Sequence, residues 1–313
     1  MDSTAARRRP QRDAPHTADR PGPARAGGPG RLSAWLELTK PGITRLVVAT
    51  AAAAYYLASA GSIDWLGFIH TIVGIALVGS GANALNQFAE RDADALMRRT
   101  AGRPLPTGRV SVPEALIFGT ALAFIGLVHL FFLVNPLTAG IVLASLLSYL
   151  FVYTPLKRRT WHATLVGTVP GALPALAGWT AATGSISAGG LAVFAIVMVW
   201  QMPHFFALGW MYREDYERGG FRMLSRFDPS GSRTTRQMAA YTSVLLPVSL
   251  LPAAIGITSW WYAVGATVLG LAFLIVQLPM FADRARGKAH RVFLASIIYL
   301  PALLALMVID RAI

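Results

Sequence analysis

Three oxygen-bearing side chains recur at four-residue intervals in the stretch NALNQFAERDADALMRRTAGRPL. They are Asn86, Glu90 and Asp94. On an α-helix this spacing places all three on one face, about 6 Å apart per step. Mg²⁺ prefers a few carboxylates together with water and phosphate oxygens, so the row predicts a magnesium site. A solvated helix end with ordinary Glu–Arg pairs is the alternative reading of the spacing alone. Asp92 faces away from the row and is not a candidate.

Basic side chains follow the carboxylates directly. Arg99 and Arg103 lie just beyond the row, and the segment YTPLKRRT contributes Tyr153 and Lys157, again four residues apart. Carboxylates that hold a divalent ion beside arginine and lysine suit a diphosphate, because the metal bridges its oxygens while the cations neutralise the remaining charge. For the lysine and its neighbouring arginines, membrane orientation alone is the alternative explanation.

A third group of candidates lies in WQMPHFFALGWMYREDYERGGFRML, residues 200–224. His204 falls inside a long apolar run, and an ionisable residue within a membrane span is a functional candidate because its burial is costly. Pro203 beside it can kink the helix and release a backbone carbonyl. Asp215 follows at the end of that helix. A histidine satisfied by its neighbours and a solvated acidic turn are the ordinary alternatives.

The elements that must position these residues are predicted to be membrane spans. Of 313 residues, 54% are hydrophobic and only 14% are charged, which is too apolar for a soluble domain of this size. Runs long enough to cross a bilayer as helices recur along the chain. The absence of cysteine excludes disulfides. We therefore predict an all-α integral membrane protein with nine transmembrane helices, at about 43–60, 65–87, 114–133, 136–153, 162–182, 189–211, 239–257, 260–281 and 291–309.

The positive charge follows the predicted spans. All but one of the 28 Lys and Arg residues fall on one side of the nine-span arrangement, and only Arg311 lies opposite. Cytoplasmic loops of membrane proteins carry such an excess, so the N-terminus is predicted inside and the C-terminus outside. This placement argues against nucleic-acid binding despite the net charge of +13. A bacterial cytoplasmic membrane is favoured over the mitochondrial inner membrane.

Residues 1–34 form a separate region in this prediction. They are rich in Arg, Pro and Gly and lack the apolar stretch of a secretory signal. We expect a disordered basic cytoplasmic tail, followed by the transmembrane domain at residues 35–313. A mitochondrial transit peptide is the alternative, and the acidic residues of the segment argue against it.

The first motif and its basic residues resemble the signature of the UbiA-type intramembrane prenyltransferases. The match runs from Asn86 through Arg99-Thr100 and Arg103 to Gly108. The segments TKPGI, YTPLKRRT and residues 200–224 are similar to the branch of that family that farnesylates haem. The resemblance covers about residues 35–310. It implies nine helices around a central cavity that opens toward the cytoplasm.

The resemblance also implies a reaction and its participants. The farnesyl group of farnesyl diphosphate joins a vinyl group of haem B, water is added, and haem O and diphosphate are the products. Mg²⁺ is the implied cofactor, and the bilayer and a downstream haem A synthase are the expected partners. Carried over residue by residue, Asn86, Glu90 and Asp94 hold Mg²⁺ and the diphosphate, Arg99, Arg103, Tyr153 and Lys157 bind the diphosphate, and His204 and Asp215 belong to the second motif.

Several positions depart from the family pattern. Glu90 stands where many relatives have Asp, and Gly42 stands where many bacterial relatives carry Arg, a role that Arg45 one turn further on can take over. Met211 replaces a second carboxylate four residues before Asp215. His204 in this motif suits a haem-facing role better than a metal–diphosphate role.

Two other functions are compatible with parts of the pattern. One is the same machinery acting on a quinone precursor or a chlorin, against which the replacement of acidic residues by WQMPHF argues. The other is a transporter, which predicts repeats and polar residues in the middle of several spans. Here the polar residues gather at one predicted end.

Overall fold

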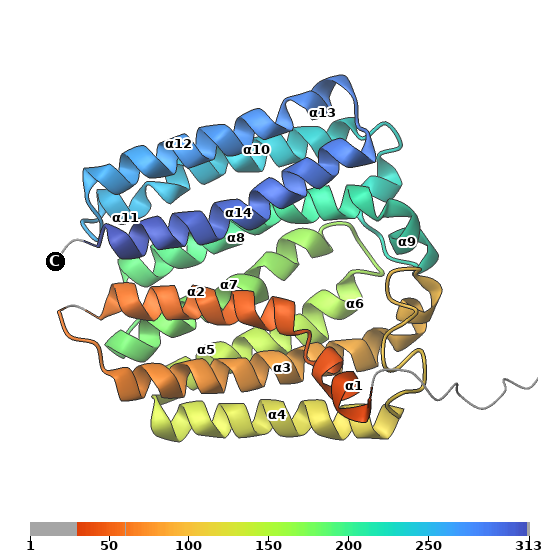
Figure 1. Cartoon of the computed structure of the whole chain (residues 1–313), viewed down its shortest axis with the longest axis horizontal. Coiled ribbons are helices and arrows are strands. Elements are labelled where there is room, and N and C mark those ends of the chain that lie inside the picture. The colour runs from red at the N-terminus through yellow and green to blue at the C-terminus, as the bar shows by residue number, and fades with distance from the viewer. Residues whose placement is uncertain (1–29, 60, 312–313) are drawn as a thin grey trace, which may run out of the picture.

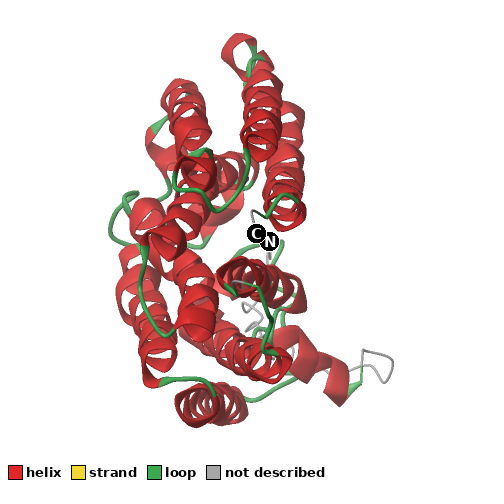
Figure 2. Cartoon of the chain, turned by 90° about the vertical axis from the view of Figure 1, so that its left-hand side faces the viewer, coloured by secondary structure: helices red, strands yellow, loops and turns green. Residues whose placement is uncertain are grey.

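The protein was analysed as a computed structural model, which describes residues 30–59 and 61–311. In this part of the chain the regular structure is helical, with one isolated β-bridge between Thr258 and Arg311 (Figure 2). The all-α prediction is confirmed. Most of the predicted tail lies outside the described residues, and its last residues begin helix α1 (Arg31–Leu38).

The predicted spans coincide with long helices that run side by side (Figure 1). Eight helical segments of the described chain are long and apolar enough to cross a membrane, and α2 is not among them. The count of nine spans and the cytoplasmic opening therefore remain predictions. The long helices are α2 (Pro41–Ala58), α3 (Trp65–Leu96), α4 (Val112–Leu133), α5 (Pro136–Leu147), α7 (Ala163–Thr183), α8 (Ala188–Met211), α10 (Ser232–Ser249), α12 (Trp260–Gln277) and α14 (Arg286–Ile309).

Short helices extend or connect the long ones, mostly at their ends (Figure 1). A π-helical turn at Ser148–Tyr153 continues α5 into α6 (Thr154–Leu156), so this predicted span is one continuous unit. After α8 come α9 (Arg213–Arg218) and a 3₁₀ turn at Leu224–Phe227. A short turn joins α4 to α5, and the connection from α10 to α12 includes α11 (Leu251–Ala254). A last short helix, α13 (Pro279–Ala282), follows α12.

The buried apolar side chains form two main clusters. One lies among α2, α3, α4, α5 and α7, and includes Ile75, Leu130 and Leu146. The other lies mainly among α8, α10, α12 and α14, includes Ile196 and Leu300, and also takes in residues of α2 and α7. Many large apolar side chains point outward instead, as expected for helices that meet lipid rather than water. The protein is an integral membrane protein.

Small residues let α3 and α4 approach closely. A Cβ added at Gly81 of α3 would lie 2.6 Å from the carbonyl oxygen of Gly119 on α4. Two turns further along α4, a Cβ added at Gly126 would lie 2.9 Å from the carbonyl oxygen of Gly74 on α3. Contacts of this kind hold membrane helices together by van der Waals packing. They fix α3, which carries the candidate carboxylates.

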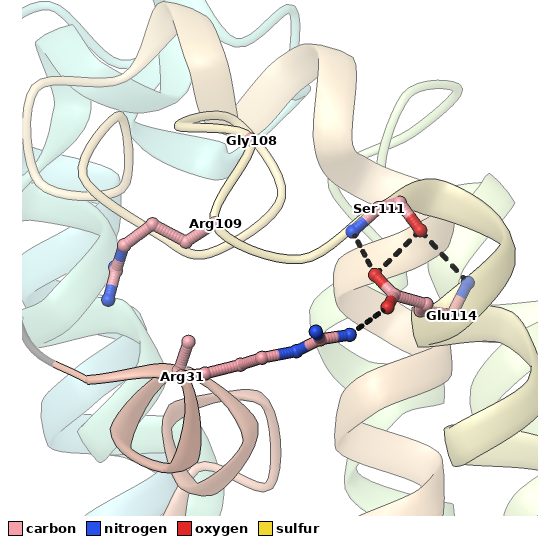
Figure 3. Close-up of a pocket in the computed structure, with 6 residues that line it drawn as sticks. Arg31, Gly108, Arg109, Ser111 and Glu114 are labelled. Carbon is pink, nitrogen blue, oxygen red and sulfur yellow. Dashed lines mark hydrogen bonds and ion pairs between the residues drawn. The ribbon is translucent and has the colours of Figure 1, made fainter. Parts of the chain in front are cut away.

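The loop between α3 and α4 is anchored where α4 begins (Figure 3). Ser111 and Glu114 form a capping box, in which the Glu114 carboxylate accepts the Ser111 backbone N–H at 2.9 Å. Arg31 of α1 pairs with Glu114. These groups line a shallow pocket of about 430 Å³, together with Ala34, Gly108 and Arg109. Helix α1 thereby braces the loop that carries Arg99 and Arg103.

Candidate active site

The predicted row of oxygen side chains is buried near the C-terminal end of α3. Asn86, Glu90 and Asp94 are 1%, 6% and 1% exposed, whereas Asp92 is exposed on the other side of the helix. A solvated helix end does not bury two carboxylates to this extent, because an unpaired buried charge is costly. The alternative of a solvated helix end is therefore excluded. The two buried carboxylates require cationic or hydrogen-bonding partners.

Each member of the row contacts a basic side chain from another segment. Lys157 donates to Oε1 of Glu90 at 2.8 Å, and Arg103 donates to Oδ2 of Asp94 at 2.7 Å. Lys40 donates to Oδ1 of Asn86 at 2.9 Å. We call these six residues the charged cluster. The structure thus brings together two predicted basic residues with the two predicted carboxylates, and adds a third cation that sequence reasoning missed.

Lys40 stands between α1 and α2 in an unusual backbone conformation. It is the only non-glycine residue in the described chain with a positive φ, at 46°. Burial and the nearby Arg103 lower the pKa of Lys40 to about 7, against the opposing effect of Glu90. The signal for it in the sequence was TKPGI, in which the lysine precedes a proline at the first helical position. That signal indicates where helix α2 begins, but it does not reveal what the Lys40 side chain contacts.

One oxygen of the charged cluster has no partner. Oδ1 of Asp94 is buried and makes no hydrogen bond in the described part of the chain. A buried carboxylate oxygen left without a donor suits a cation that the structure does not contain. No group of three His, Cys, Asp or Glu side chains gathers at metal-binding distance among the described residues. The chemistry of the donors therefore fits Mg²⁺ held by Asp94, Glu90 and the Asn86 amide oxygen, with its other oxygens from a ligand and water.

Lys157 is held over aromatic rings at the end of the α5–α6 span. Its Nζ lies 4.5 Å from the centre of the Tyr153 ring and 5.7 Å from that of Phe221. Burial alone lowers the pKa of Lys157, but the neighbouring Tyr153 and Glu90 side chains raise it overall. Gly167 of α7 makes room for the tyrosine, since a Cβ there would lie 2.4 Å from its ring. The π-helical turn that ends at Tyr153 is a feature often found at functional sites.

The second motif contacts the first through the loop after α3. Asp215 of α9 accepts a hydrogen bond from the Arg98 backbone N–H at 3.1 Å and pairs with Arg218 at 3.3 Å. Arg99 lies over the rings of Tyr212 and Tyr216, at 4.9 and 4.4 Å. Neither Arg99 nor Asp215 contacts the carboxylates of α3 in the described structure. Their present contacts position the loop, and their predicted roles toward a ligand remain predictions.

The other two candidates lie apart from the charged cluster. His204 is half-buried between α8 and α14, where its Nδ1 lies 2.8 Å from the Ser296 hydroxyl. Arg45 is exposed on the first turns of α2 and makes no hydrogen bond or ion pair within residues 30–59 and 61–311. Helix α8 continues through Pro203 without ending. The structure does not test the predicted role of either candidate.

A pocket of about 280 Å³ adjoins the charged cluster on the side of α1 and α2. Lys40 and Arg103 line it, and a further wall comes from Gly42. A Cβ added at Gly42 would meet nothing within 4 Å, so the absence of a side chain there keeps this approach open. The same two basic side chains therefore face both the oxygen row of α3 and the pocket.

Comparison with known proteins assigns this arrangement to a family. Residues 47–300 match the UbiA prenyltransferase family. The chain belongs to the UbiA prenyltransferase family. The prediction from the Asn86–Gly108 motif is thereby confirmed for the chain as a whole, since the match covers well over half of it.

Bacterial relatives of this UbiA-family chain are similar over most of their length. The protoheme IX farnesyltransferase of Solibacter usitatus is 45% identical over 286 residues, covering 88% of this chain and 98% of that protein. The protoheme IX farnesyltransferase of Salinibacter ruber is 46% identical over 276 residues, with the same shares covered.

Solved structures of other family members share the fold. A UbiA homologue from Archaeoglobus fulgidus bound to GPP and Mg²⁺ has a TM-score of 0.63 at 15% identity, covering 88% of this chain and 99% of that one. A digeranylgeranylglyceryl phosphate synthase has a TM-score of 0.74 at 18% identity, covering 90% and 98%. At such identities the likeness concerns the fold alone.

Proposed function

We propose that this UbiA-family protein transfers the farnesyl group of farnesyl diphosphate to a vinyl group of haem B and so produces haem O. The observation that carries the proposal is the charged cluster, in which a buried row of oxygen ligands meets three basic side chains. Diphosphate is the group such a cluster suits best, because it combines a need for a divalent ion with a need for further positive charge. The names of the relatives at 45% and 46% identity supply the acceptor.

The proposed reaction balances without an oxidant or reductant. The bond between the first farnesyl carbon and the diphosphate oxygen breaks, and diphosphate leaves with the electron pair. The allylic cation is attacked by the vinyl double bond, which forms a carbon–carbon bond and moves the positive charge to the carbon beside the porphyrin ring. Water adds there and loses a proton, which yields the alcohol of haem O.

The charged cluster serves the leaving group in this scheme. Asp94, Glu90 and Asn86 would hold Mg²⁺, which neutralises charge on the diphosphate when bound. Lys157, Arg103 and Lys40 already lie against these oxygens, where they can donate to a diphosphate that binds beside them. Stabilisation of the developing negative charge lowers the barrier to bond cleavage.

Two further residues are positioned to help with the same group. The Tyr153 ring lies beneath the Lys157 ammonium, so a diphosphate bound by Lys157 would lie close to Tyr153 as well. Arg99 can leave its two tyrosine rings at modest cost, since a cation–π contact at an exposed site contributes about 0.5–1 kcal/mol. Asp215 keeps the loop that carries Arg99 against α9.

The bilayer position also belongs to the proposal. We place the charged cluster at the cytoplasmic end of the bundle, because the loops at that end hold nearly all basic residues of the sequence. The C-terminal end of α14 then lies outside. Farnesyl and porphyrin are apolar and reach the site from the lipid, and exclusion of water protects the allylic cation until its acceptor reacts.

A product assay tests the proposal. Purified protein receives haem B, farnesyl diphosphate and Mg²⁺, and the extracted haems are analysed by mass spectrometry. We expect a haem species heavier by one farnesyl group plus water, and its loss on addition of a chelator. A folded protein that leaves haem B unchanged but prenylates a quinone precursor would overturn the choice of acceptor while keeping the prenyltransfer.

A further inference from the structure

His204 is held on three sides by α8 and α14. Its ring lies nearly parallel to Trp200, with centres 5.2 Å apart, and 4.9 Å from the centre of Phe293. Its Nδ1 lies 2.8 Å from the hydroxyl of Ser296, a residue that is fully buried. The same serine accepts the Trp200 indole N–H on its backbone carbonyl at 2.8 Å. One serine therefore places both the imidazole and the indole that stacks on it.

The direction of the hydrogen bond follows from the number of protons that Ser296 carries. A serine hydroxyl has one proton to donate. Ser296 donates it to the backbone carbonyl of Phe293, at 2.6 Å. The hydroxyl oxygen can then only accept from His204, so Nδ1 of the imidazole carries a proton. In the neutral ring the other nitrogen, Nε2, is left with its lone pair.

The lone pair of Nε2 is not used by the protein. Nε2 makes no hydrogen bond to any described residue, and it is not one of the enclosed polar atoms that lack a partner. Nε2 therefore keeps some accessible surface. No charged side chain within residues 30–59 and 61–311 is paired with His204. A neutral imidazole with a fixed tautomer and an open Nε2 is the form in which histidine binds a metal ion.

We propose that Ser296 is a positioning residue that fixes the tautomer and direction of His204, so that Nε2 binds the iron of the haem substrate. The inference rests on the proposed function, because haem B supplies the iron. Trp200 and Phe293 complete the arrangement as flat apolar surfaces beside the ring. We call His204, Ser296, Trp200 and Phe293 the histidine cluster.

Haem binding followed by absorption spectroscopy tests the inference. Haem B is titrated into the purified full-length protein, into His204→Ala and into Ser296→Ala. We expect a nitrogen-ligated haem spectrum for the wild type, its loss in His204→Ala, and its return when imidazole is added to that variant. Ser296→Ala should bind haem about 10–100-fold more weakly, as is usual when the partner of a ligating histidine is removed.

A matched control separates positioning from general packing. Ser249 is also fully buried and also joins α14, through a 2.9 Å hydrogen bond to Tyr299, but it does not contact His204. Ser249→Ala should leave the haem spectrum unchanged, and farnesyl diphosphate should bind all three variants as it binds the wild type. That last binding measurement also shows that each variant is folded.

Two results would overturn the inference and leave the proposed function intact. They are an unchanged spectrum and affinity in His204→Ala, or equal haem affinity in Ser296→Ala and the wild type, while the wild type makes farnesylated haem. If the wild type makes no such product, the proposed function itself fails. The product assay on the wild type therefore distinguishes the two failures.

Discussion

The carboxylate row of α3 and the histidine of α8 both lie toward the helix ends that meet α9, yet they differ in nearly every physical property (Figure 1). The charged cluster consists of buried oxygen side chains held by partly exposed basic ones. The histidine cluster is neutral, aromatic and held by one hydroxyl. The first suits a small, highly charged ligand and the second a large, flat, apolar one. The difference indicates that the two substrates are bound by separate parts of the bundle.

The two regions also differ in how much they contribute to the stability of the fold. Buried ion pairs contribute little net stability, because desolvation offsets their attraction, and loss of one partner leaves an uncompensated charge. The charged cluster is therefore better explained by a ligand than by stability. Stacked rings and a satisfied hydroxyl, in contrast, stabilise the helix packing around His204 even without a ligand.

Loss of Asp94, the carboxylate with one unpaired oxygen, should have the largest effect on the charged cluster. Asp94→Asn removes the charge that holds Mg²⁺, and we expect turnover to fall at least about 100-fold, as when an electrostatic contact to the transition state is lost. The product assay measures this. Asp92→Asn, on the exposed side of the same helix, is the control and should be fully active. An Asp94→Asn variant with most of its activity would refute the metal assignment.

Loss of a single cation should have a smaller effect. Lys157→Met removes one donor to the diphosphate and leaves Glu90 unpaired, so we expect kcat/KM for farnesyl diphosphate to fall about 10–100-fold. Haem affinity should stay the same, because Lys157 does not contact the histidine cluster. Arg158→Met, an exposed neighbour, is the control. A loss of haem affinity in Lys157→Met would break the division between the two regions.

Displacement of Tyr153 should have a weaker effect still. A methyl group at Gly167 would overlap the tyrosine ring, and overpacking of this kind costs about 1–3 kcal/mol. We expect Gly167→Ala to lower kcat/KM about tenfold through the shifted ring and Lys157 above it. Gly140→Ala, where a Cβ meets nothing within 4 Å, should have no effect in the same kinetic assay. Equal activity of both variants would remove Tyr153 from the diphosphate site.

The smallest effect belongs to a residue outside both clusters. Asp228 accepts hydrogen bonds from the backbone N–H and hydroxyl of Thr234, at 2.7 and 2.9 Å, where α10 begins. Burial alone raises the pKa of Asp228, but these bonds lower it overall. Because the folded-state pKa is depressed, the stabilisation is present above the ordinary value of 3.8 and disappears as pH falls through the folded-state pKa.

Asp228→Ala should therefore lower stability at pH 7 by about 1 kcal/mol without a change in kcat/KM. Thermal unfolding measured at pH 7 and again below pH 3.8 checks this, and the difference from the wild type should shrink at the lower pH. Of the hydrogen bonds to Asp228, Ser230→Ala removes only the 3.2 Å bond from the Ser230 hydroxyl, keeps both bonds to Thr234, and should lower stability less than Asp228→Ala. A difference that persists unchanged at low pH would contradict the capping role.

The sequence predicted the charged cluster in part. Four-residue spacing puts Glu90 and Asp94 on one helix face whatever the rest of the chain does, and the structure confirms this. Lys40 was missed because it lies 46 residues before the Asn86 that it contacts. Periodicity orders side chains within one helix, but it carries no information on which helices face one another.

The histidine cluster shows the same limit more clearly. His204 stood out because an ionisable residue is rare inside a span, but nothing near it in sequence suggests Ser296, which lies 92 residues further on. The role of Ser296 follows only from the two hydrogen bonds of its hydroxyl, to Phe293 and to His204, which the sequence does not reveal. The π-helical turn that ends at Tyr153 was missed for a related reason, since such a turn has no sequence pattern of its own in an apolar run.

The separation of the two binding regions is tested most directly by one matrix of four affinities. Asp94→Asn and His204→Ala are each titrated with farnesyl diphosphate in the presence of Mg²⁺ and with haem B. The account predicts that Asp94→Asn loses metal-dependent farnesyl diphosphate binding and keeps haem, while His204→Ala loses haem and keeps farnesyl diphosphate. Two variants that each lose both substrates to the same degree, while still folded, would contradict it.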